Sequence, residues 1–439
     1  MKIRGLVVAA VVFFILAGIL YWSEHRKPAD DTVKASADTP PAILKLDSSS
    51  ITQLDLKKMN AETVVLTKTE SGKWQITQPK PFGADQDAVS SMLSTLSSLN
   101  SERLVEDKAS DLKAYGLDQP ALEVDVTGKS NKTQKLLLGD DTPTGSAVYA
   151  MLAGDPRVFT VASYTKNSVD KGLNDVRDKR LLTVNSDKIS WLEIVRKGQT
   201  IEFGRNKDLW QILKPKPLRA DTSQVSEVVR KLTDAKMNLS TADLKTDSAA
   251  FAHARPLANA KVMDESGTQS LQVRKDKDTY YVKSSAVEGA YKIDADLGKA
   301  LDKSLDDFRG KKLFDLGYAD PGKVEIRSGS KAYFLTRGGE DWWSNGKKMD
   351  ADSVQSLVSK LRDLTADKFP ESGFANPTIE ASVTSEDGKH VEKVQIVKSS
   401  DGYVAKRENE PALYHLSSSS IDDIQKAADE IKPAAPPSK

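Results

Sequence analysis

Cysteine is absent from this 439-residue chain, and histidine occurs only four times. Without cysteine the protein can form no disulfide, no thiolate metal site and no cysteine nucleophile, so packing must supply its stability. The histidines are scattered, and no two of them have the spacing of metal ligands. They are His25, His253, His390 and His415. The sequence therefore indicates no zinc site, and we expect no metal and no cofactor.

An excess of charge of either sign is also absent. The chain has 64 basic and 63 acidic side chains, which leave a formal net charge of +1. A nucleic-acid-binding protein usually carries a strongly basic face, so we expect no nucleic-acid partner. Gly-x-Ser-x-Gly elbows, Walker loops and dinucleotide-binding fingerprints are missing from every strand-to-helix setting in the sequence. The sequence thus offers no catalytic constellation, and we expect the protein not to be an enzyme.

The N-terminus contains an uncharged run of 18 residues, from Gly5 to Trp22. At 1.5 Å per residue, a helix of this length spans about 27 Å, close to the ~30 Å hydrocarbon core of a bilayer. The run ends in two aromatic residues, which favour the membrane interface. A cleaved signal peptide is the alternative, but its apolar region is usually about 7 to 15 residues and ends at a small-x-small site. We therefore predict a retained anchor over residues 1–27, which contacts the cytoplasmic membrane through residues 5–22.

Residues 28–45 have no apolar periodicity and are rich in proline and acidic residues, so we interpret them as a flexible linker. Lysine and arginine are nearly balanced on the two sides of the apolar run, and long domains cross membranes largely regardless of charge. We favour a single-pass protein of the bacterial cytoplasmic membrane with its body on the periplasmic or extracytoplasmic side. Residues 433–439 are predicted to be a disordered tail.

An internal repeat organises the rest of the chain. A stretch of twelve residues occurs twice, with eight identities, and a third time in shorter form. The copies are Trp74 to Asp85, Trp210 to Asp221 and Trp342 to Asp350. The three aspartates are 136 and 129 residues apart, which exceeds the period of about 20 to 50 residues that is typical of solenoids. Each copy should therefore belong to a domain with its own core.

The same pattern of secondary structure surrounds each copy. Short β-branched runs between polar turns predict strands, and aliphatic residues at helical spacing after each aspartate predict a helix with one apolar stripe. The stripes are Val89, Met92, Leu93 and Leu96; Val225, Val228, Val229 and Leu232; and Val354, Leu357, Val358 and Leu361. Further strands and a second helix complete each unit. This pattern predicts an α+β fold of three tandem repeated domains of antiparallel strands with two helices each, over 46–182, 183–314 and 315–432, preceded by one transmembrane helix.

The repeated tryptophan and aspartate each have a functional and a structural interpretation. The tryptophans, Trp74, Trp210 and Trp342, could be exposed stacking platforms for a sugar or peptide. Each of them opens a strand, however, so we interpret them as core anchors. The aspartates, Asp85, Asp221 and Asp350, could be hydrolase carboxylates. Each lies four residues before the first residue of its stripe, where a helix N-cap is expected, so we interpret them as caps.

One loop of the first repeat is a candidate ligand or ion site. Its candidate residues are Gly139, Asp140, Asp141, Thr142, Thr144 and Gly145. Two carboxylates and a hydroxyl could bind Ca²⁺, which prefers about six to eight oxygen ligands. A tight turn between two strands requires the same residue types, and the spacing matches no EF-hand. The later repeats lack this loop, so any function of it would belong to the first domain alone.

Two basic groups follow the closing segments of the first two repeats. They are Arg177, Lys179 and Arg180, and Arg309, Lys311 and Lys312. These side chains could contact phosphate or an anionic lipid. The interpretation that we favour is that they match the negative ends of helix dipoles.

Several segments of the first repeat carry a family resemblance. They are Trp74-Gln75-Ile76 with Ala84-Asp85, Tyr115 to Pro120, Leu138 to Tyr149 and Arg177 to Leu182. In these segments the chain resembles the bacterial family called domain of unknown function 4340, strongly over residues 46–182, partly over 183–314 and less beyond. The resemblance implies one N-terminal membrane helix, an extracytoplasmic accessory role and genes beside ABC-transporter components of the gliding-motility type. It implies no catalytic residues.

The sequence leads to one main functional hypothesis and two alternatives. We expect a membrane-anchored extracytoplasmic accessory or scaffold protein that binds a protein partner in the cell envelope, such as an ABC-transporter complex of gliding-motility type. One alternative is an envelope hydrolase that uses Asp140, Asp141 and Asp155, which would need two carboxyl groups about 5 to 10 Å apart. The other is a small-ligand binding module, for which a concave pocket would be the sign.

Overall fold

The computed structural model describes residues 42–44, 46–239, 247–315 and 319–435. The predicted membrane anchor, nearly all of the predicted linker and most of the predicted tail lie outside the described residues. Within the described ranges, no helix is both long enough and apolar enough to cross a membrane.

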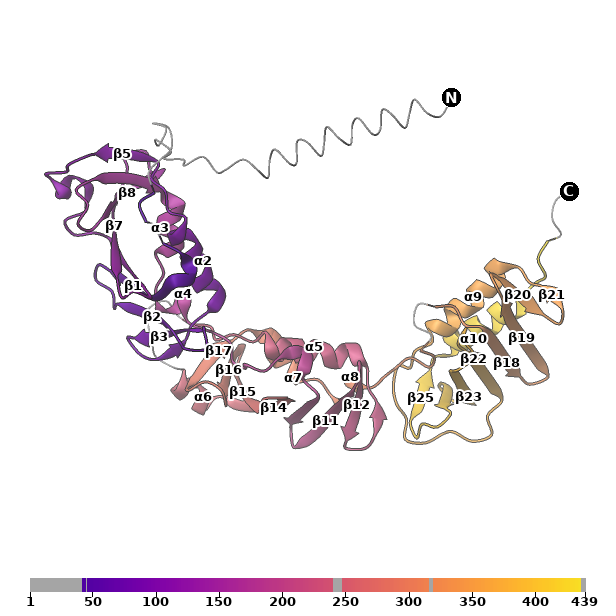
Figure 1. Cartoon of the computed structure of the whole chain (residues 1–439). Coiled ribbons are helices and arrows are strands. Elements are labelled where there is room, and N and C mark those ends of the chain that lie inside the picture. The colour runs from indigo at the N-terminus through magenta and orange to yellow at the C-terminus, as the bar shows by residue number, and fades with distance from the viewer. Residues whose placement is uncertain (1–41, 45, 240–246, 316–318, 436–439) are drawn as a thin grey trace, which may run out of the picture. The chain divides into compact units, whose positions relative to one another are not determined.

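Three antiparallel sheets make up the described chain, as an α+β fold with three repeats predicts (Figure 1). The chain divides into two compact units, one ending at Asp178 and one beginning at Lys179. The unit that ends at Asp178 contains the first sheet, which we call the first domain. The unit 179–439 contains the other two sheets, which we call the second and third domains.

The first sheet has nine strands in the order β4-β3-β2-β1-β6-β7-β8-β9-β5. Its strands are β1 (Ile51–Lys58), β2 (Val64–Lys68), β3 (Trp74–Gln78), β4 (Phe82–Gly83), β5 (Arg103–Glu106), β6 (Leu122–Gly128), β7 (Thr133–Asp141), β8 (Ala147–Leu152) and β9 (Val158–Ala162). Its helices are η1 (Ser48–Ser50), α2 (Gln86–Ser97), η2 (Leu112–Tyr115), α3 (Ser163–Val169) and α4 (Leu173–Val176).

The second sheet has eight strands in the order β13-β12-β11-β10-β14-β15-β16-β17. Its strands are β10 (Trp191–Arg196), β11 (Gln199–Asn206), β12 (Leu209–Lys214), β13 (Leu218–Arg219), β14 (Arg255–Asp264), β15 (Gly267–Asp276), β16 (Thr279–Ser284) and β17 (Ala290–Ile293). Its helices are η3 (Ser186–Lys188), α5 (Thr222–Thr233), α6 (Ser248–His253), α7 (Ala295–Leu301) and α8 (Leu305–Phe308).

The third sheet repeats this order as β21-β20-β19-β18-β22-β23-β24-β25. Its strands are β18 (Lys323–Ser328), β19 (Lys331–Gly338), β20 (Asp341–Ser344), β21 (Lys347–Lys348), β22 (Ile379–Thr384), β23 (Val391–Ser399), β24 (Gly402–Arg407) and β25 (Leu413–Leu416). Its helices are α9 (Ala351–Arg362) and α10 (Ser418–Asp429).

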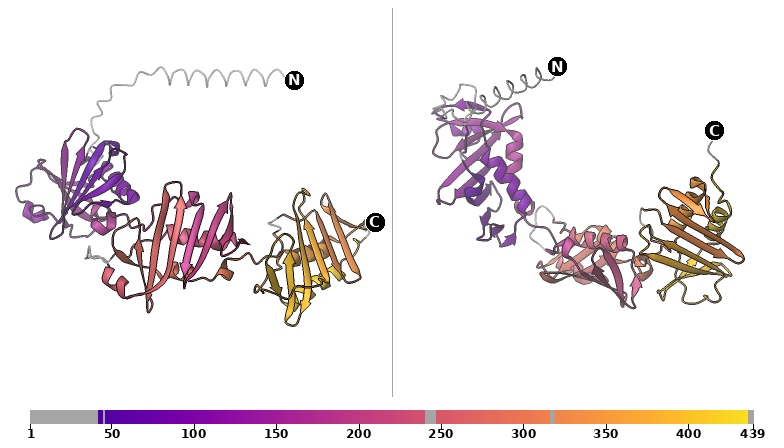
Figure 2. Two further views of the ribbon diagram at one scale, coloured as in Figure 1. Left: turned by 90° about the horizontal axis from the view of Figure 1, so that it is seen from below. Right: turned by 45° about the vertical axis from the view of Figure 1, so that its right-hand side comes forward.

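The main helix of each domain covers one face of its sheet (Figures 1 and 2). The predicted stripes are the buried sides of α2, α5 and α9. The repeated tryptophans join the same cores, with exposed fractions of 7% for Trp74, 3% for Trp210 and 5% for Trp342. The structural interpretation of the tryptophans therefore agrees with their burial.

The closing segments of the first two domains differ from the prediction of one second helix each. In both domains the segment divides into two short helices, α3 and α4 or α7 and α8. The break in the first domain is at Gly172, whose backbone N–H donates to Asp175 at 2.7 Å. Ser304 donates to Asp307 at the same distance in the second domain. These local bonds start a new helix and so interrupt the predicted one.

A backbone hydrogen bond from the cap aspartate closes each domain. The N–H group of Asp85 donates to the carbonyl of Val176, near the end of the first domain. Asp221 donates to Phe308 and Asp350 donates to Lys432 in the same way. Because the same hydrogen bond occurs in all three domains, the domains end at equivalent positions.

The segments that connect the domains lie along the edges of the sheets. In the second domain the incoming chain pairs at Arg180 with Lys236, and Asn238 pairs in turn with Lys292 of edge strand β17. The outgoing chain pairs at Arg309 with Ala220, beside the opposite edge strand β13. Both edges of this sheet are therefore covered, which protects it from pairing with another chain.

The cores also correct the predicted domain boundaries. Ile43 and Leu44, which we predicted to lie in the linker, are buried in the first core. Leu181 and Leu182 pack in the second core, and Leu313 and Phe314 pack in the third. The sequence analysis predicted Leu181 and Leu182 to end the first domain, and Leu313 and Phe314 to end the second. The segments that start at Arg177 and at Arg309 resemble each other, so we interpreted both as the last residues of a repeat. Their apolar residues instead pack in the core of the following domain, and the predicted boundaries are therefore too late.

Candidate functional site

The predicted loop of the first repeat divides between the end of β7, which contains Gly139, Asp140 and Asp141, and the turn that leads to β8, which contains Thr142, Thr144 and Gly145. The N–H group of Gly145 donates to Thr142 at 2.7 Å, and that of Thr142 donates to Ala147 at 2.8 Å. Gly145 has a φ of +71°, which favours glycine. The hydroxyl groups of Thr142 and Thr144 lie 3.2 Å apart. Ser163 of α3 also donates to the carbonyls of Gly145 and Ser146, so bonds within the turn and from α3 fix its conformation.

Two of the carboxylates in the same region, those of Asp141 and Asp155, have basic partners. Lys166 lies 3.3 Å from Asp141, whose side chain is 62% exposed. Asp155 accepts hydrogen bonds from Arg157, with a shortest distance of 2.6 Å. These hydrogen bonds lower the pKa of Asp155 from its ordinary value. Among the described residues, no group of three or more histidine or acidic side chains has the arrangement of a metal site.

Two segments of the family resemblance meet at this turn. A Cβ atom on Gly139 would lie 2.2 Å from the carbonyl oxygen of Tyr115, so a larger residue has no room. Gly116 has a φ of +63°, and a Cβ atom there would lie 2.5 Å from the carboxyl carbon of Asp140. Close packing therefore explains why glycine stands at positions 116 and 139.

The three repeated aspartates cap the main helices. Asp85 accepts hydrogen bonds from the N–H groups of Asp87 and Ala88 at 3.1 Å. Asp221 accepts from Gln224 at 3.1 Å, and Asp350 accepts from Ser353 at 3.0 Å. These carboxylates satisfy helix N-termini, which is the structural role that their spacing predicts.

The sheet face opposite the main helix carries a repeated acidic position that the sequence analysis did not identify. In each domain an acidic residue of the first strand lies between two buried aliphatic residues. The triplets are Leu54-Asp55-Leu56, Leu192-Glu193-Ile194 and Val324-Glu325-Ile326. Strand alternation places the acid on the face away from the core. The signal in the sequence was a single acid within a short aliphatic run.

Basic side chains on neighbouring strands pair with acids on these open faces. In the first domain, Lys57 lies 2.7 Å from both Glu123 and Asp125, and Lys135 lies 2.8 Å from Glu123. Burial alone would raise the pKa of Glu123, but the hydrogen bonds from the two lysines outweigh it and lower that pKa. In the second domain, Lys261 lies 2.9 Å from Glu193 and Lys214 lies 2.6 Å from Glu202.

The open face of the third domain also exposes two aromatic side chains. Phe334 is 37% exposed and Trp343 is 41% exposed. Trp343 stands opposite Thr336, which lies on the same side of β19 as Phe334. The guanidinium of Arg327 lies 5.8 Å from the ring centre of Phe334. This combination of aromatic rings and arginine is typical of protein-binding hot spots.

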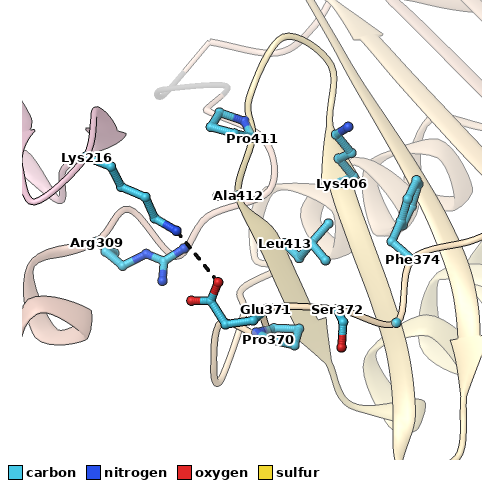
Figure 3. A pocket seen from close by; sticks show the side chains of 11 residues that line it. Lys216, Arg309, Pro370, Glu371, Ser372, Phe374, Lys406, Pro411, Ala412 and Leu413 are labelled. Carbon is cyan, nitrogen blue, oxygen red and sulfur yellow. Dashed lines mark ion pairs between the residues drawn. The ribbon is translucent and has the colours of Figure 1, made fainter.

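A cavity of about 340 Å³ lies in the 179–439 unit (Figure 3). Three of its lining side chains are cationic, and one is acidic. They are Lys216, Arg309, Lys406 and Glu371. Lys216 and Arg309 point toward Glu371, and the nearest atoms of Lys216 and Glu371 are 3.7 Å apart. Phe374 and Leu413 contribute apolar surface. A neighbouring cavity of about 430 Å³ shares Pro411 and Ala412 with it.

Arg309 is the most buried cation of this cavity. Its side chain is 8% exposed and lies 3.2 Å from Asp306. Its guanidinium carbon lies 3.5 Å from the ring centre of Phe369, in the geometry of a cation–π contact. The equivalent Arg177 of the first domain lies over Phe82 of its own domain, at 4.0 Å. The structure thus gives the two predicted basic groups different surroundings.

The chain that enters the second domain is held by two neutral side chains, which we call the neutral clamp. Ser284 donates a hydrogen bond to the carbonyl of Leu181. Gln269 accepts from the N–H group of Thr183 at 2.9 Å and donates to its hydroxyl at 2.8 Å. The carbonyl of Leu181 and the N–H group of Thr183 are therefore both hydrogen-bonded to uncharged side chains.

The chain that enters the third domain is held by two charged side chains at the equivalent positions, which we call the ionic clamp. Arg407 donates to the carbonyl of Leu313, and Glu392 accepts from the N–H group of Asp315 at 2.6 Å. The two side chains are 2.8 Å apart and are 11% and 6% exposed. Burial tends to raise the pKa of Glu392, but the hydrogen bond and charge of Arg407 hold it below its ordinary value.

A family model described as "Domain of unknown function (DUF4340)" matches this chain twice, over residues 74–211 and 210–382. Both matches start at a repeated tryptophan, Trp74 or Trp210, and the first ends one residue after Trp210. The first match therefore covers about one period of the repeat, whereas the second extends into β22 of the third domain; both begin in the third strand of a sheet. No curated protein matches the chain.

Solved structures give only weak similarities. A crystal structure of the DNA polymerase sliding clamp from Pseudomonas aeruginosa is 6% identical and has a TM-score of 0.15, with 86% of this chain and 93% of that chain covered. A crystal structure of the DNA polymerase III subunit beta from the same organism is 7% identical with the same TM-score, and 86% of this chain and 94% of that chain are covered. Similarity at this level supports no conclusion about fold or function.

Proposed function

The chain belongs to the family of the domain of unknown function DUF4340, and we propose that it is a binding protein. It is a membrane-anchored extracytoplasmic scaffold that binds a protein partner in the cell envelope. The observation that carries this proposal is the threefold repetition of a sheet domain with a charged face opposite its main helix.

The open faces favour binding through side chains. The connecting segments cover both edges of the second sheet, so a partner strand has little room to add there. Trp343, Phe334 and Arg327 give the third domain the strongest docking surface of this kind. An ABC-transporter complex is the partner class that we propose from the family resemblance.

Photo-crosslinking in native membranes tests the docking surface. A photoreactive residue at Thr336 lies between the exposed aromatic rings, and one at Gln355 on α9 is a control on the helix-covered side. We expect the same protein, identified by mass spectrometry, to be crosslinked from Thr336 and not from Gln355. The substitution Trp343→Ala should abolish this crosslink. Recovery of the chain alone from both positions would contradict the proposal.

The anchor requires a separate test. The uncharged run over residues 5–22 supports a retained membrane helix. We expect the full chain to resist alkaline extraction from membranes and a variant that lacks residues 1–27 but carries a cleavable signal to be released. Protease added to the outside of spheroplasts should digest the body of the full chain. A mature N-terminus beyond residue 22 would show cleavage and overturn the anchor.

A further inference from the structure

The cavity of Figure 3 has more positive than negative charge. Three cationic side chains and a single carboxylate line it. The carboxylate, Glu371, is 86% exposed and lies 3.7 Å from Lys216, which is 55% exposed. An exposed pair at this distance contributes little because water screens it. Glu371 therefore compensates little of the positive charge of the cavity. Asp306, which is 59% exposed and lies 3.2 Å from Arg309, offsets part of the charge of that residue, so Lys216 and Lys406 carry most of the excess.

Arg309 is held in position before any ligand binds. Its side chain is 8% exposed, and Phe369 stacks against the guanidinium at 3.5 Å. A guanidinium presents several N–H donors in a fixed plane, which matches two oxygens of a phosphate or carboxylate group. Because the stacking already restricts its rotamers, Arg309 loses little conformational entropy on binding an anion.

Lys406 adds charge from a different element. It belongs to β24, where its backbone pairs with Leu413, another lining residue. Among the residues that the structure describes, Lys406 takes part in no ion pair. Lysine is a compact point charge on a mobile stem, so it can follow an anion into place. Lys216 adds a second mobile positive charge from the loop between β12 and β13.

We propose that this cavity binds a phosphate group of a small molecule or of a lipid headgroup. Arg309 donates the paired hydrogen bonds, and Lys216 and Lys406 neutralise the remaining charge. Three cations and one carboxylate line the cavity and Arg309 also pairs with Asp306, so a phosphate group with one or two negative charges fits the remaining positive charge. The volume of about 340 Å³ is within the range of small-molecule sites, and Phe374 and Leu413 fit an apolar part of the ligand.

Calorimetric titration of the full chain in detergent with pyrophosphate tests the site. Lys216→Gln and Lys406→Gln should each raise the dissociation constant roughly tenfold, because each removes one charge-assisted hydrogen bond. Glu371→Gln should lower it by roughly threefold, since a competing negative charge is removed. Lys389→Gln is the matched control, since Lys389 is an 84% exposed lysine outside the cavity. It should leave the dissociation constant unchanged.

A second arm distinguishes the two sources of phosphate. The same variants are measured for binding to phosphatidylcholine vesicles with and without phosphatidic acid, so that membrane insertion of residues 1–27 cancels. Pyrophosphate binding with the expected order of variants supports a small phosphate compound. The same order seen only for phosphatidic acid supports a lipid headgroup. Absence of binding in both arms, or binding that Lys216→Gln, Lys406→Gln and Glu371→Gln leave unchanged, overturns the proposal.

Discussion

The neutral clamp of the second domain and the ionic clamp of the third domain perform the same task with different chemistry. In both, one side chain donates to a backbone carbonyl of the incoming chain and another accepts from a backbone N–H group two residues later. Ser284 and Gln269 do this without charge, whereas Arg407 and Glu392 do it as a buried ion pair. The two domains therefore have the same backbone donor and acceptor to satisfy, but they satisfy them with different side chains.

The difference has energetic consequences. A neutral hydrogen bond contributes about 0.5 to 1.5 kcal/mol and responds little to pH or salt. A buried ion pair must offset the loss of hydration of both charges, so it stabilises little as a pair but is costly to break. Arg407 also contacts Glu410 at 2.8 Å, and Arg219 of the second domain lies 3.5 Å from that carboxylate. The ionic clamp thus extends into a network, whereas the neutral clamp does not depend on one.

Removal of one charged partner should give the largest effect. We expect Glu392→Ala to lower the free energy of unfolding of the third domain by about 3 to 5 kcal/mol, because Arg407 keeps only the more exposed Glu410 as a partner and the N–H group of Asp315 loses its acceptor. Gln269→Ala should cost the second domain only about 1 to 2 kcal/mol. Hydrogen exchange of the full chain, read separately for β14–β16 and β22–β24, measures both. Equal losses in the two domains would refute the distinction between the clamps.

Transplanting the neutral clamp into the third domain should restore part of this loss. The double substitution Glu392→Gln with Arg407→Ser copies the residue types of the second domain and leaves no buried charge. We expect it to be about 1 to 2 kcal/mol less destabilising than Glu392→Ala, because neighbouring residues are not additive. The same exchange measurement applies, with Arg407→Ser alone as the control. A double variant that is as unstable as the sum of its single changes would argue against the pairing.

Acid should affect the third domain through its clamp. The pKa of Glu392 is lowered in the folded state, because Arg407 outweighs the opposing effect of burial. The stability that this carboxylate contributes is complete above its ordinary pKa of 4.5 and is lost as the pH falls through the lower folded value. We expect pulse proteolysis in urea to show a loss of third-domain stability on acidification that Glu392→Gln reduces. The clamp of the second domain has no titrating group, so Gln269→Ala should not alter the acid response of that domain.

The helix caps should show the smallest and most even effects. Asp221→Ala and Asp350→Ala each remove one side-chain bond to a helix N-terminus, at 3.1 and 3.0 Å. We expect each to cost about 1 kcal/mol in its own domain. Urea unfolding followed by domain-resolved proteolysis measures the two costs. The cap geometry is the same in both domains, so the two costs should be similar. A large difference between them would mean that the second and third domains differ in more than their clamps.

Local patterns were sufficient to predict most of the fold. The stripes after Asp85, Asp221 and Asp350 predicted the main helices because the apolar period and the cap are properties of adjacent residues. The turn that was predicted for the Gly139 to Gly145 segment is found only from Thr142 on, where glycine and short polar residues have a local reason to be, whereas Gly139 to Asp141 extend β7. The split closing helices were missed because their breaks depend on single bonds such as that of Gly172.

The clamps and the cavity could not be predicted in the same way. Arg407 and Leu313 are 94 positions apart, and only the pairing of whole strands brings them together. Arg309 was noted as a basic residue at a chain end, but its contact with Phe369 depends on a residue of the next domain. Sequence periodicity describes which face a residue occupies. It does not specify which distant side chain it meets.

The covered edges of the second sheet determine how this domain would respond to mechanical tension. The chain enters along the segment around Lys236, which in turn pairs with β17, and leaves beside β13, so it enters and leaves at opposite edges of the sheet. A force along the chain would therefore act across the strands, in the direction of the hydrogen bonds between them. Bonds loaded in this direction open one after another, whereas bonds loaded in shear must break together. Tension on the two ends of this domain would therefore separate its strands at a low force and lengthen the chain.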